Sequence, residues 1–390
     1  MKSILYSLCS LLFLSLLGSC KQDKKETERT GEIKTEETME KSETIKLLVG
    51  TYTNKESEGI YTVDFDQVTG KLRNKQLVAS TSNPSFLKIS KDGKRVFAVN
   101  ENDPGTVTSF KWDEKGTQLI VIDQQPSAGA HPCFLELNEA EDKLAVANYS
   151  SGTVSVFGVG PNGELAPGPQ VREHQGSGPV MPNQESAHAH CSLFSKGQDL
   201  LYAVDLGADK VFSYHIDGQG KLGAQKLALS LTPGDGPRHM VFHPTKEWAF
   251  IITELSSTVV SVKVDPETGS LTKIDQQSTL PEGFKGENAC ADIHISEDGK
   301  FLYASNRGHN SIAVFSVGDN GKLQLMGTTA TEGDWPRNFT LSPDGKFLLV
   351  ANQNSDSITV FKLDGQTGMP VYTGNQIELS MPVCLVFEGQ

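Results

Sequence analysis

A pattern of residues recurs along most of the chain and restricts its possible folds more than any other feature. The clearest copies are PSFLKISKDGKRVFAVN at 84–100, PCFLELNEAEDKLAVAN at 132–148 and PRNFTLSPDGKFLLVAN at 336–352. Further copies begin at Ala189, Pro237 and Cys290, and a truncated copy begins at Pro382. Successive copies begin 48, 57, 48, 53, 46 and 46 residues apart. A repeat of this period indicates one supersecondary unit used many times.

Each copy reads as four short β-strands. Apolar and polar residues alternate within it, as half-buried strands require. Asp-Gly or a substitute marks a tight turn between the first two strands, and a third strand such as SITVFKLD at 357–364 follows. A turn that contains glycine, such as DNGKL at 319–323, leads into a more variable fourth strand. Four short strands in slightly fewer than 50 residues predict one blade of a β-propeller.

The copies together predict an all-β protein, a seven-bladed β-propeller with four-stranded antiparallel blades. The last copy ends after one strand, and residues 47–72 supply a second strand, a third strand and a turn. We therefore expect the N- and C-terminal strands to share one blade and close the ring, which removes free sheet edges. Two stacked β-sandwiches are the alternative fold. We expect the protein to be a monomer.

The first residues have the pattern of a targeting segment. Residues 1–19 are expected to be a lipoprotein signal peptide, in which a charged Lys2 precedes an apolar stretch that is short for a membrane span. The sequence LGSC at 17–20 resembles a bacterial lipobox, which implies cleavage before Cys20 and lipidation of its thiol. An ordinary secretory signal or a membrane helix is the alternative.

Residues 20–44 are expected to hold the lipidated cysteine and a disordered linker. Fourteen of the 24 residues at 21–44 are charged, and such a segment buries too little apolar surface to fold alone. The propeller domain then occupies residues 45–390. This organisation places the protein in a bacterial cell envelope, on the periplasmic or surface side, with membrane contact only through the lipid anchor.

The composition excludes several classes of function. The net charge of −13 argues against nucleic-acid binding, which needs a basic surface. The sequence has no Rossmann glycine motif, P-loop, HExxH or CxxC pair, so we expect neither a cofactor nor a metal. The cysteines of the repeats lie in apolar strand contexts and are expected to be buried free thiols, with a disulfide as the alternative: Cys133, Cys191, Cys290 and Cys384.

The ends of the repeated hairpins carry residues that a buried core does not need. If each copy begins at position 0, positions 1 and 17 lie at the same end of its first hairpin. The first strand of a blade is innermost, so these side chains should meet at one mouth of the central channel. Position 1 holds Ser85, Cys133, His190, Arg238, Ala291, Arg337 and Val383. Position 17 holds Glu101, Tyr149, Leu206, Glu254, Arg307 and Gln353, with Thr51 from the composite blade.

Charged residues are concentrated at this predicted mouth. They are Glu101, Arg238, Glu254, Arg307 and Arg337, joined by His190. A pocket shared by neighbouring blades is the functional interpretation, and a ring of salt bridges that plugs the channel is the alternative. The weaker candidates for substrate binding are His188, His239, Tyr149, Glu101 and Arg337, and His188 could serve only to orient His190. Long loops at 173–187 and 281–289 are expected to form the rim.

Several motifs in order now give a resemblance. HAH at 188–190, GPRH at 236–239, TEL at 253–255 and SNRGHNSIAVF at 305–315 make the chain similar to the seven-bladed lactonase family. That family contains propeller-type 6-phosphogluconolactonases and fungal carboxymuconate lactonising enzymes, and the likeness covers residues 46–390. The resemblance implies that the catalytic residues are His190, Arg238, Glu254 and Arg307.

These side chains suit the hydrolysis of a cyclic ester. His190 or Glu254 could be the general base. Arg238 and Arg307 suit a carboxylate, a phosphate or a developing oxyanion. We expect a small anionic or sugar lactone as the substrate, since no G-x-S-x-G serine motif is present. A muconate-type lactonising isomerase and a propeller that binds a partner without catalysis are the alternatives.

Overall fold

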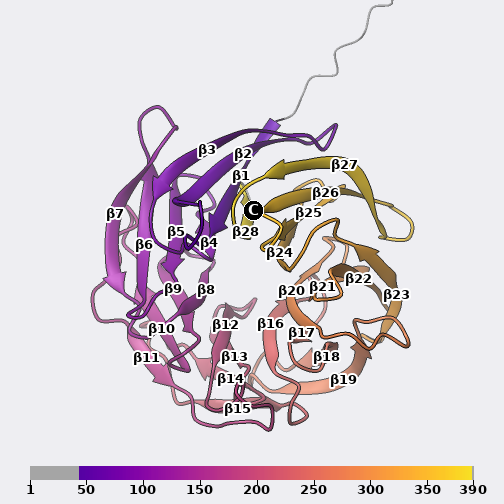
Figure 1. Ribbon diagram of the computed structural model, residues 1–390. Coiled ribbons are helices and arrows are strands. Elements are labelled where there is room, and N and C mark those ends of the chain that lie inside the picture. The colour runs from indigo at the N-terminus through magenta and orange to yellow at the C-terminus, as the bar shows by residue number, and fades with distance from the viewer. Residues whose placement is uncertain (1–43, 389–390) are drawn as a thin grey trace, which may run out of the picture. The chain divides into compact units, whose positions relative to one another are not determined.

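The computed structural model describes residues 44–388, and the structural statements below concern this part of the chain. It contains 28 β-strands in seven four-stranded antiparallel sheets that form a ring (Figure 1). The predicted seven-bladed β-propeller is therefore confirmed. The expected signal peptide, Cys20 and the linker up to residue 43 lie outside the described residues. Within residues 44–388 no helix could cross a membrane.

The strands of each blade follow one another from the channel outward. The inner strands are β28 (Pro382–Phe387), β4 (Leu87–Ile89), β8 (Pro132–Leu137), β12 (Ala189–Phe194), β16 (Pro237–Phe242), β20 (Ala289–Ile295) and β24 (Pro336–Leu341). The second strands are β1 (Thr44–Thr51), β5 (Arg95–Asn100), β9 (Lys143–Asn148), β13 (Leu200–Asp205), β17 (Trp248–Thr253), β21 (Phe301–Arg307) and β25 (Phe347–Asn352).

The two outer strands complete each blade. The third strands are β2 (Gly59–Asp66), β6 (Thr106–Trp112), β10 (Thr153–Gly158), β14 (Lys210–His215), β18 (Thr258–Val264), β22 (Ser311–Val317) and β26 (Ser357–Leu363). The fourth strands are β3 (Leu72–Ser80), β7 (Leu119–Pro126), β11 (Gln170–Glu173), β15 (Lys226–Ser230), β19 (Leu271–Ser278), β23 (Leu323–Ala330) and β27 (Pro370–Glu378).

The hydrophobic core lies between the blades. Second strands such as β13 (LLYAVD) and β25 (FLLVAN) are buried along their whole length, because a neighbouring blade covers each face. Fourth strands such as β27 face solvent at alternate residues. Each fully buried leucine, valine or phenylalanine contributes about 1.5–3 kcal/mol. This packing between blades makes a rigid frame for the residues that border the channel.

The termini close the ring inside one blade, whose strand order is β28-β1-β2-β3. Leu47 pairs with Phe387 and Val49 pairs with Leu385 in antiparallel register. Phe65 of β2 contacts Phe387 at 5.3 Å between ring centroids, so the closure is packed as well as hydrogen-bonded. The alternative of two stacked sandwiches is wrong.

The composite blade corrects one sequence expectation. Thr51 lies opposite Pro382, the first residue of its copy, and therefore occupies position 16. Tyr52, the next residue, occupies position 17 in place of Thr51. The two halves of this blade are at opposite ends of the chain, so spacing along the sequence could not fix their relative frame. Only the strand pairing does so.

A β-bulge interrupts most inner strands at position 1. In β16, for example, Pro237 pairs with Thr253 and His239 with Ile252, which leaves Arg238 as the extra residue. The register shifts at the same place in β8, β12, β20, β24 and the β1–β28 pair. In a regular strand, neighbouring side chains point to opposite faces. The bulge removes this constraint, and both Arg238 and His239 border the same small cavity of the channel.

Candidate active site

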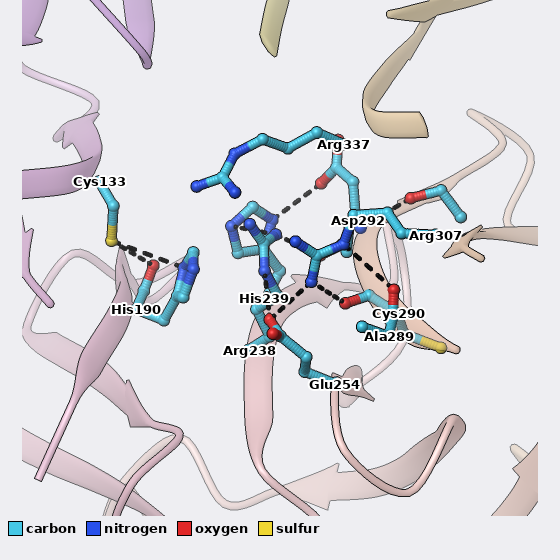
Figure 2. Close-up of polar contacts among 12 residues, drawn as sticks. Cys133, His190, Arg238, His239, Glu254, Ala289, Cys290, Asp292, Arg307 and Arg337 are labelled. Carbon is cyan, nitrogen blue, oxygen red and sulfur yellow. Dashed lines mark hydrogen bonds and ion pairs between the residues drawn. The ribbon is translucent and has the colours of Figure 1, made fainter. Parts of the chain in front are cut away.

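Of the charged residues predicted from the repeat, His190, Arg238, Glu254, Arg307 and Arg337 lie together at one end of the channel (Figure 2), and Glu101 pairs with Arg337. Three inner strands contribute the side chain at their bulge, and three second strands contribute the residue at or just after their end. We call this set the charged end, and its members are Glu101, His190, Arg238, Glu254, Arg307 and Arg337. The blade frame therefore brings together residues that are far apart in the sequence.

Glu254 joins two arginines from neighbouring blades. Its Oε2 lies 3.0 Å from Nε of Arg238 and 2.9 Å from Nη2 of Arg307. The side chains of Arg238, Arg307 and Glu254 are 2%, 5% and 15% exposed, respectively. Burial by itself would raise the pKa of Glu254, but Arg307, Arg238 and Arg337 outweigh it and hold this pKa below its ordinary value. Glu254 is therefore ionised at neutral pH, and its Oε2 is already engaged in ion pairs with Arg238 and Arg307.

Arg238 is fixed by further contacts. Its Nη1 donates to the carbonyl oxygen of Ala291 and lies 3.2 Å from Nε2 of His239. Burial, followed by Arg307 and Arg337, lowers the pKa of Arg238 to about 10, which leaves the guanidinium charged at neutral pH. The orientation of Arg238 is thus set by groups of its own blade and the next.

Asp292 holds His239 from the other side, and the sequence reasoning missed this aspartate. Nδ1 of His239 lies 2.8 Å from Oδ1 of Asp292. Burial, together with Arg238, lowers the pKa of His239 to about 4, so its ring is neutral at pH 7. The tautomer with hydrogen on Nδ1 donates to Asp292 and accepts from Arg238 at Nε2. His239 is therefore a positioning group for Arg238. The repeat could have shown this, because Asp292 is at position 2 of its copy, as His239 is.

Arg307 is anchored in a similar way. Its Nε donates to the carbonyl oxygen of Ala289 at 3.1 Å, and its Nη2 donates to that of Cys290 at 3.0 Å. The ring of Trp335 lies 5.3 Å from its Cζ, within the range of a cation–π contact. Trp335 has a left-handed backbone with φ of 65°, a strained conformation that recurs at functional sites.

His190 differs from the other members because one ring nitrogen is unused. Nδ1 lies 3.6 Å from Sγ of Cys133, and no residue within 44–388 hydrogen-bonds to Nε2. The ring packs edge-on against Tyr149 at 5.6 Å and His239 at 5.2 Å. Burial, Arg238, His239 and Arg337 lower the pKa of His190 well below 6.5. With hydrogen on Nδ1, the neutral ring presents a lone pair at Nε2.

His188 acts on a different neighbour from the one expected. Its ring stacks on Tyr149 at 4.4 Å with an interplanar angle of 10°, and its Nδ1 lies 3.0 Å from the Tyr149 carbonyl oxygen. Burial raises the pKa of Tyr149 to about 12, so its hydroxyl stays protonated. His188 therefore packs against Tyr149, which in turn packs against His190.

A second cluster at the charged end contains Tyr52, which the sequence frame missed. The Tyr52 hydroxyl lies 2.9 Å from each carboxylate oxygen of Glu101. Arg337 completes the cluster, with Nη2 at 3.9 Å from Oε1 of Glu101 and Cζ at 5.2 Å from the Tyr52 ring. The structure thus separates the predicted arginines into two groups. Arg238 and Arg307 lie within 3.0 Å of Glu254, whereas Arg337 lies 3.9 Å from Glu101.

The two long loops lead into the strands that carry the site. Residues 173–187 precede β12, which bears His190, and Gln184 anchors this loop by donating to the Leu206 carbonyl oxygen at 2.9 Å. Residues 281–289 precede β20, whose carbonyl groups bind Arg307. Among residues 44–388 no group of three or more His, Cys, Asp or Glu is placed to hold a metal.

With this geometry established, comparison with known proteins defines the family. The model of the family described as lactonase, 7-bladed beta-propeller, matches residues 46–387, and the chain belongs to this family. A 6-phosphogluconolactonase of Bacillus subtilis is 34% identical over 88% of this chain and 98% of its own. Another 6-phosphogluconolactonase, from Formosa agariphila, is 38% identical over 76% of this chain and 86% of its own.

A solved structure supports the same relationship. The periplasmic gluconolactonase of Pseudomonas aeruginosa superposes with a TM-score of 0.83 and 37% identity. The match covers 88% of this chain and 99% of that protein. The relatives thus share both the fold and about a third of the residues.

Proposed function

We propose that the protein hydrolyses a sugar lactone at the charged end of the channel. Membership of the lactonase family and relatives named for sugar lactones support the reaction. The observation that carries the assignment to this site is His190, a neutral histidine whose Nε2 has no partner within residues 44–388 and whose pKa is lowered by the nearby Arg238 and Arg337 as well as by burial.

His190 is the general base in this proposal. Its Nε2 accepts a proton from a water molecule, and the water oxygen forms a bond to the lactone carbonyl carbon. An arginine N–H stabilises the negative charge that develops on the carbonyl oxygen. The ring C–O bond then breaks, and protonated His190 returns the proton to the leaving alkoxide. The product is the open hydroxy acid, and no metal or cofactor takes part.

Glu254 has a positioning role in this scheme. Its Oε2 already contacts Arg238 and Arg307, and its pKa is lowered. A carboxylate with such partners is a poor proton acceptor, because protonation would break two ion pairs. In this proposal Glu254 instead holds the two arginines at a fixed separation, and its contacts with them favour His190 over Glu254 as the base.

We also propose that the mature protein is an exported lipoprotein anchored through Cys20. The lipobox-like sequence and the charged linker support this, and the periplasmic relative is consistent with an envelope location. A Cys20→Ala variant should appear in the soluble fraction, while the unaltered protein should partition with membranes. A Cys20→Ala variant that stays with membranes would contradict lipid anchoring.

The proposed activity is tested with purified protein and a panel of sugar lactones in a pH-stat. Measurement near pH 6 keeps spontaneous hydrolysis slow and leaves His190 unprotonated. We expect protein-dependent acid release from D-glucono-1,5-lactone or its 6-phosphate. If no lactone of the panel is opened faster than in buffer alone, the proposed function is wrong.

A further inference from the structure

The three arginines of the charged end have unequal sets of partners. Arg238 and Arg307 each contact Glu254 and also donate to backbone carbonyl groups. Arg337 makes one ion pair at 3.9 Å, to Glu101, and no hydrogen bond from its guanidinium to any residue within 44–388. A guanidinium carries five N–H donors. Arg337 therefore holds an unused set of donors, and its side chain is 18% exposed.

A second unsatisfied group lies beside Arg337. Oγ of Ser85 is buried and has no hydrogen-bond partner among the described residues. Ser85 and Arg337 border one small cavity with Arg238, and its volume of about 10 Å³ is close to that of one water-sized site. Buried polar groups in proteins are nearly always hydrogen-bonded. The unused hydroxyl and the unused guanidinium together indicate a place where one oxygen atom of a ligand bound at the mouth of this cavity is received.

Tyr52 and Glu101 fix the position of Arg337 without using its donors. The Tyr52 hydroxyl donates to the Glu101 carboxylate, so this carboxylate is partly satisfied before Arg337 approaches. The Tyr52 ring lies against the guanidinium at 5.2 Å. Arg337 is thus positioned by the Tyr52 ring, which lies against the plane of its guanidinium, and by Glu101 at 3.9 Å. Its N–H groups remain available to donate hydrogen bonds to a carboxylate or a phosphate.

We propose that Arg337 recognises a negatively charged group of the substrate, a carboxylate or a phosphate remote from the reacting ester, and that Tyr52 and Glu101 position it. The proposal rests on the proposed lactonase function and adds a division of roles. Arg238 and Arg307 stabilise the negative charge that develops on the carbonyl oxygen of the reacting ester, and Arg337 determines the preference for anionic lactones. Tyr52 belongs to the site because it helps to position Arg337.

The test compares three lactones in one set of variants. D-glucono-1,5-lactone is neutral, its 6-phosphate carries the phosphate, and D-glucaro-1,4-lactone carries a carboxylate. In Arg337→Met, kcat/KM for the two anionic lactones should fall about 10- to 100-fold relative to the neutral one, mainly through KM, because a hydrogen-bonded charge contributes about 1.5–3 kcal/mol. Tyr52→Phe should lower the same ratio by a smaller factor, because Arg337 keeps its charge.

Arg73→Met is the matched control, since it removes the same charge from β3, where the side chain is 57% exposed. It should leave the substrate ratio as in the unaltered protein. A fall for only one anionic lactone would assign Arg337 to phosphate or to carboxylate and support the proposal. An equal loss on all three lactones in Arg337→Met, or no loss, would overturn it and leave the lactonase function intact.

If the proposed lactonase function is wrong, the role of Arg337 is tested by binding and not by kinetics. If the unaltered protein opens none of the lactones, calorimetry with 6-phosphogluconate still decides the role of Arg337. Binding by the unaltered protein that weakens at least about tenfold in Arg337→Met would support an anion site. Equal binding by both proteins, or no binding by either, would overturn it.

Discussion

The two ends of the central channel are built from the same seven inner strands but hold different side chains. At the charged end, the cavity beside Arg238 and Arg337 measures about 10 Å³. Beyond a layer that includes Phe86, His239 and Asn338, a second cavity of about 300 Å³ follows. We call it the apolar cavity, and its walls include Phe134, Leu193, Val241, Leu385 and the Lys88–Glu136 pair. None of the residues of the charged end lines this larger cavity.

The difference lies in how the polar groups are satisfied. In the apolar cavity, Lys88 donates to Glu136 at 3.2 Å, and Nε2 of His294 lies 3.0 Å from Oδ2 of Asp292. At the charged end, Nε2 of His190, Oγ of Ser85 and the Arg337 guanidinium have no hydrogen-bond partner within residues 44–388. Nε of Arg238 also lacks a hydrogen bond of good geometry, although it lies 3.0 Å from Oε2 of Glu254. These unused donors and acceptors, more than cavity volume, favour the charged end as the proposed substrate site.

The largest expected effect is that of His190→Ala. Loss of the general base should lower kcat on an active lactone by about 10²–10⁴. Steady-state kinetics measures this change, and a thermal melt close to that of the unaltered protein shows that the fold survives. Unchanged turnover would mean that another group is the base and that the charged end is a structural plug.

Arg238→Met should affect both activity and stability. We expect kcat/KM to fall by about 10²–10³, as for the loss of an oxyanion donor. The free energy of unfolding should drop by about 3 kcal/mol, because Glu254 loses one partner of a buried ion pair. Denaturant unfolding beside kinetics separates the two effects. A stable variant with normal activity would remove Arg238 from the site.

The pH dependence of kcat/KM should show an acid limb below the ordinary histidine range. His190 must be neutral to accept a proton, and its pKa is lowered well below 6.5 by burial and nearby cations. The neutral base therefore persists as pH falls through 6.5 and is lost only when pH reaches the lowered pKa. Initial rates at low substrate between pH 4 and 8 measure this. A midpoint at or above 6.5 would contradict the assignment.

The smallest effect should come from the apolar cavity. Lys88→Met breaks the pair with Glu136, whose side chains are 30% and 25% exposed. We expect kcat and KM to stay unchanged, and the free energy of unfolding to shift by about 1 kcal/mol or less. A variant at this cavity that abolishes turnover would reverse the comparison between the two ends.

The repeat made most of this architecture predictable. Position 0 of six of the seven copies lies at or next to the start of an inner strand, so the blades, the closure and the grouping of His190, Arg238, Glu254 and Arg307 follow from spacing. The bulge at position 1 could not be predicted, since alternation places Arg238 and His239 on opposite faces. Tyr52 was missed because its blade is split between the termini. Asp292 was missed because the sequence analysis compared only positions 1 and 17 of the copies.

The most direct test of the account is a crystal structure of the protein soaked with gluconate, the hydroxy acid formed from D-glucono-1,5-lactone. The account predicts that its carboxylate lies within hydrogen-bond distance of an arginine of the charged end and beside Nε2 of His190. Gluconate found only in the apolar cavity, with the charged end unaltered, would contradict the claim that the charged end is the active site.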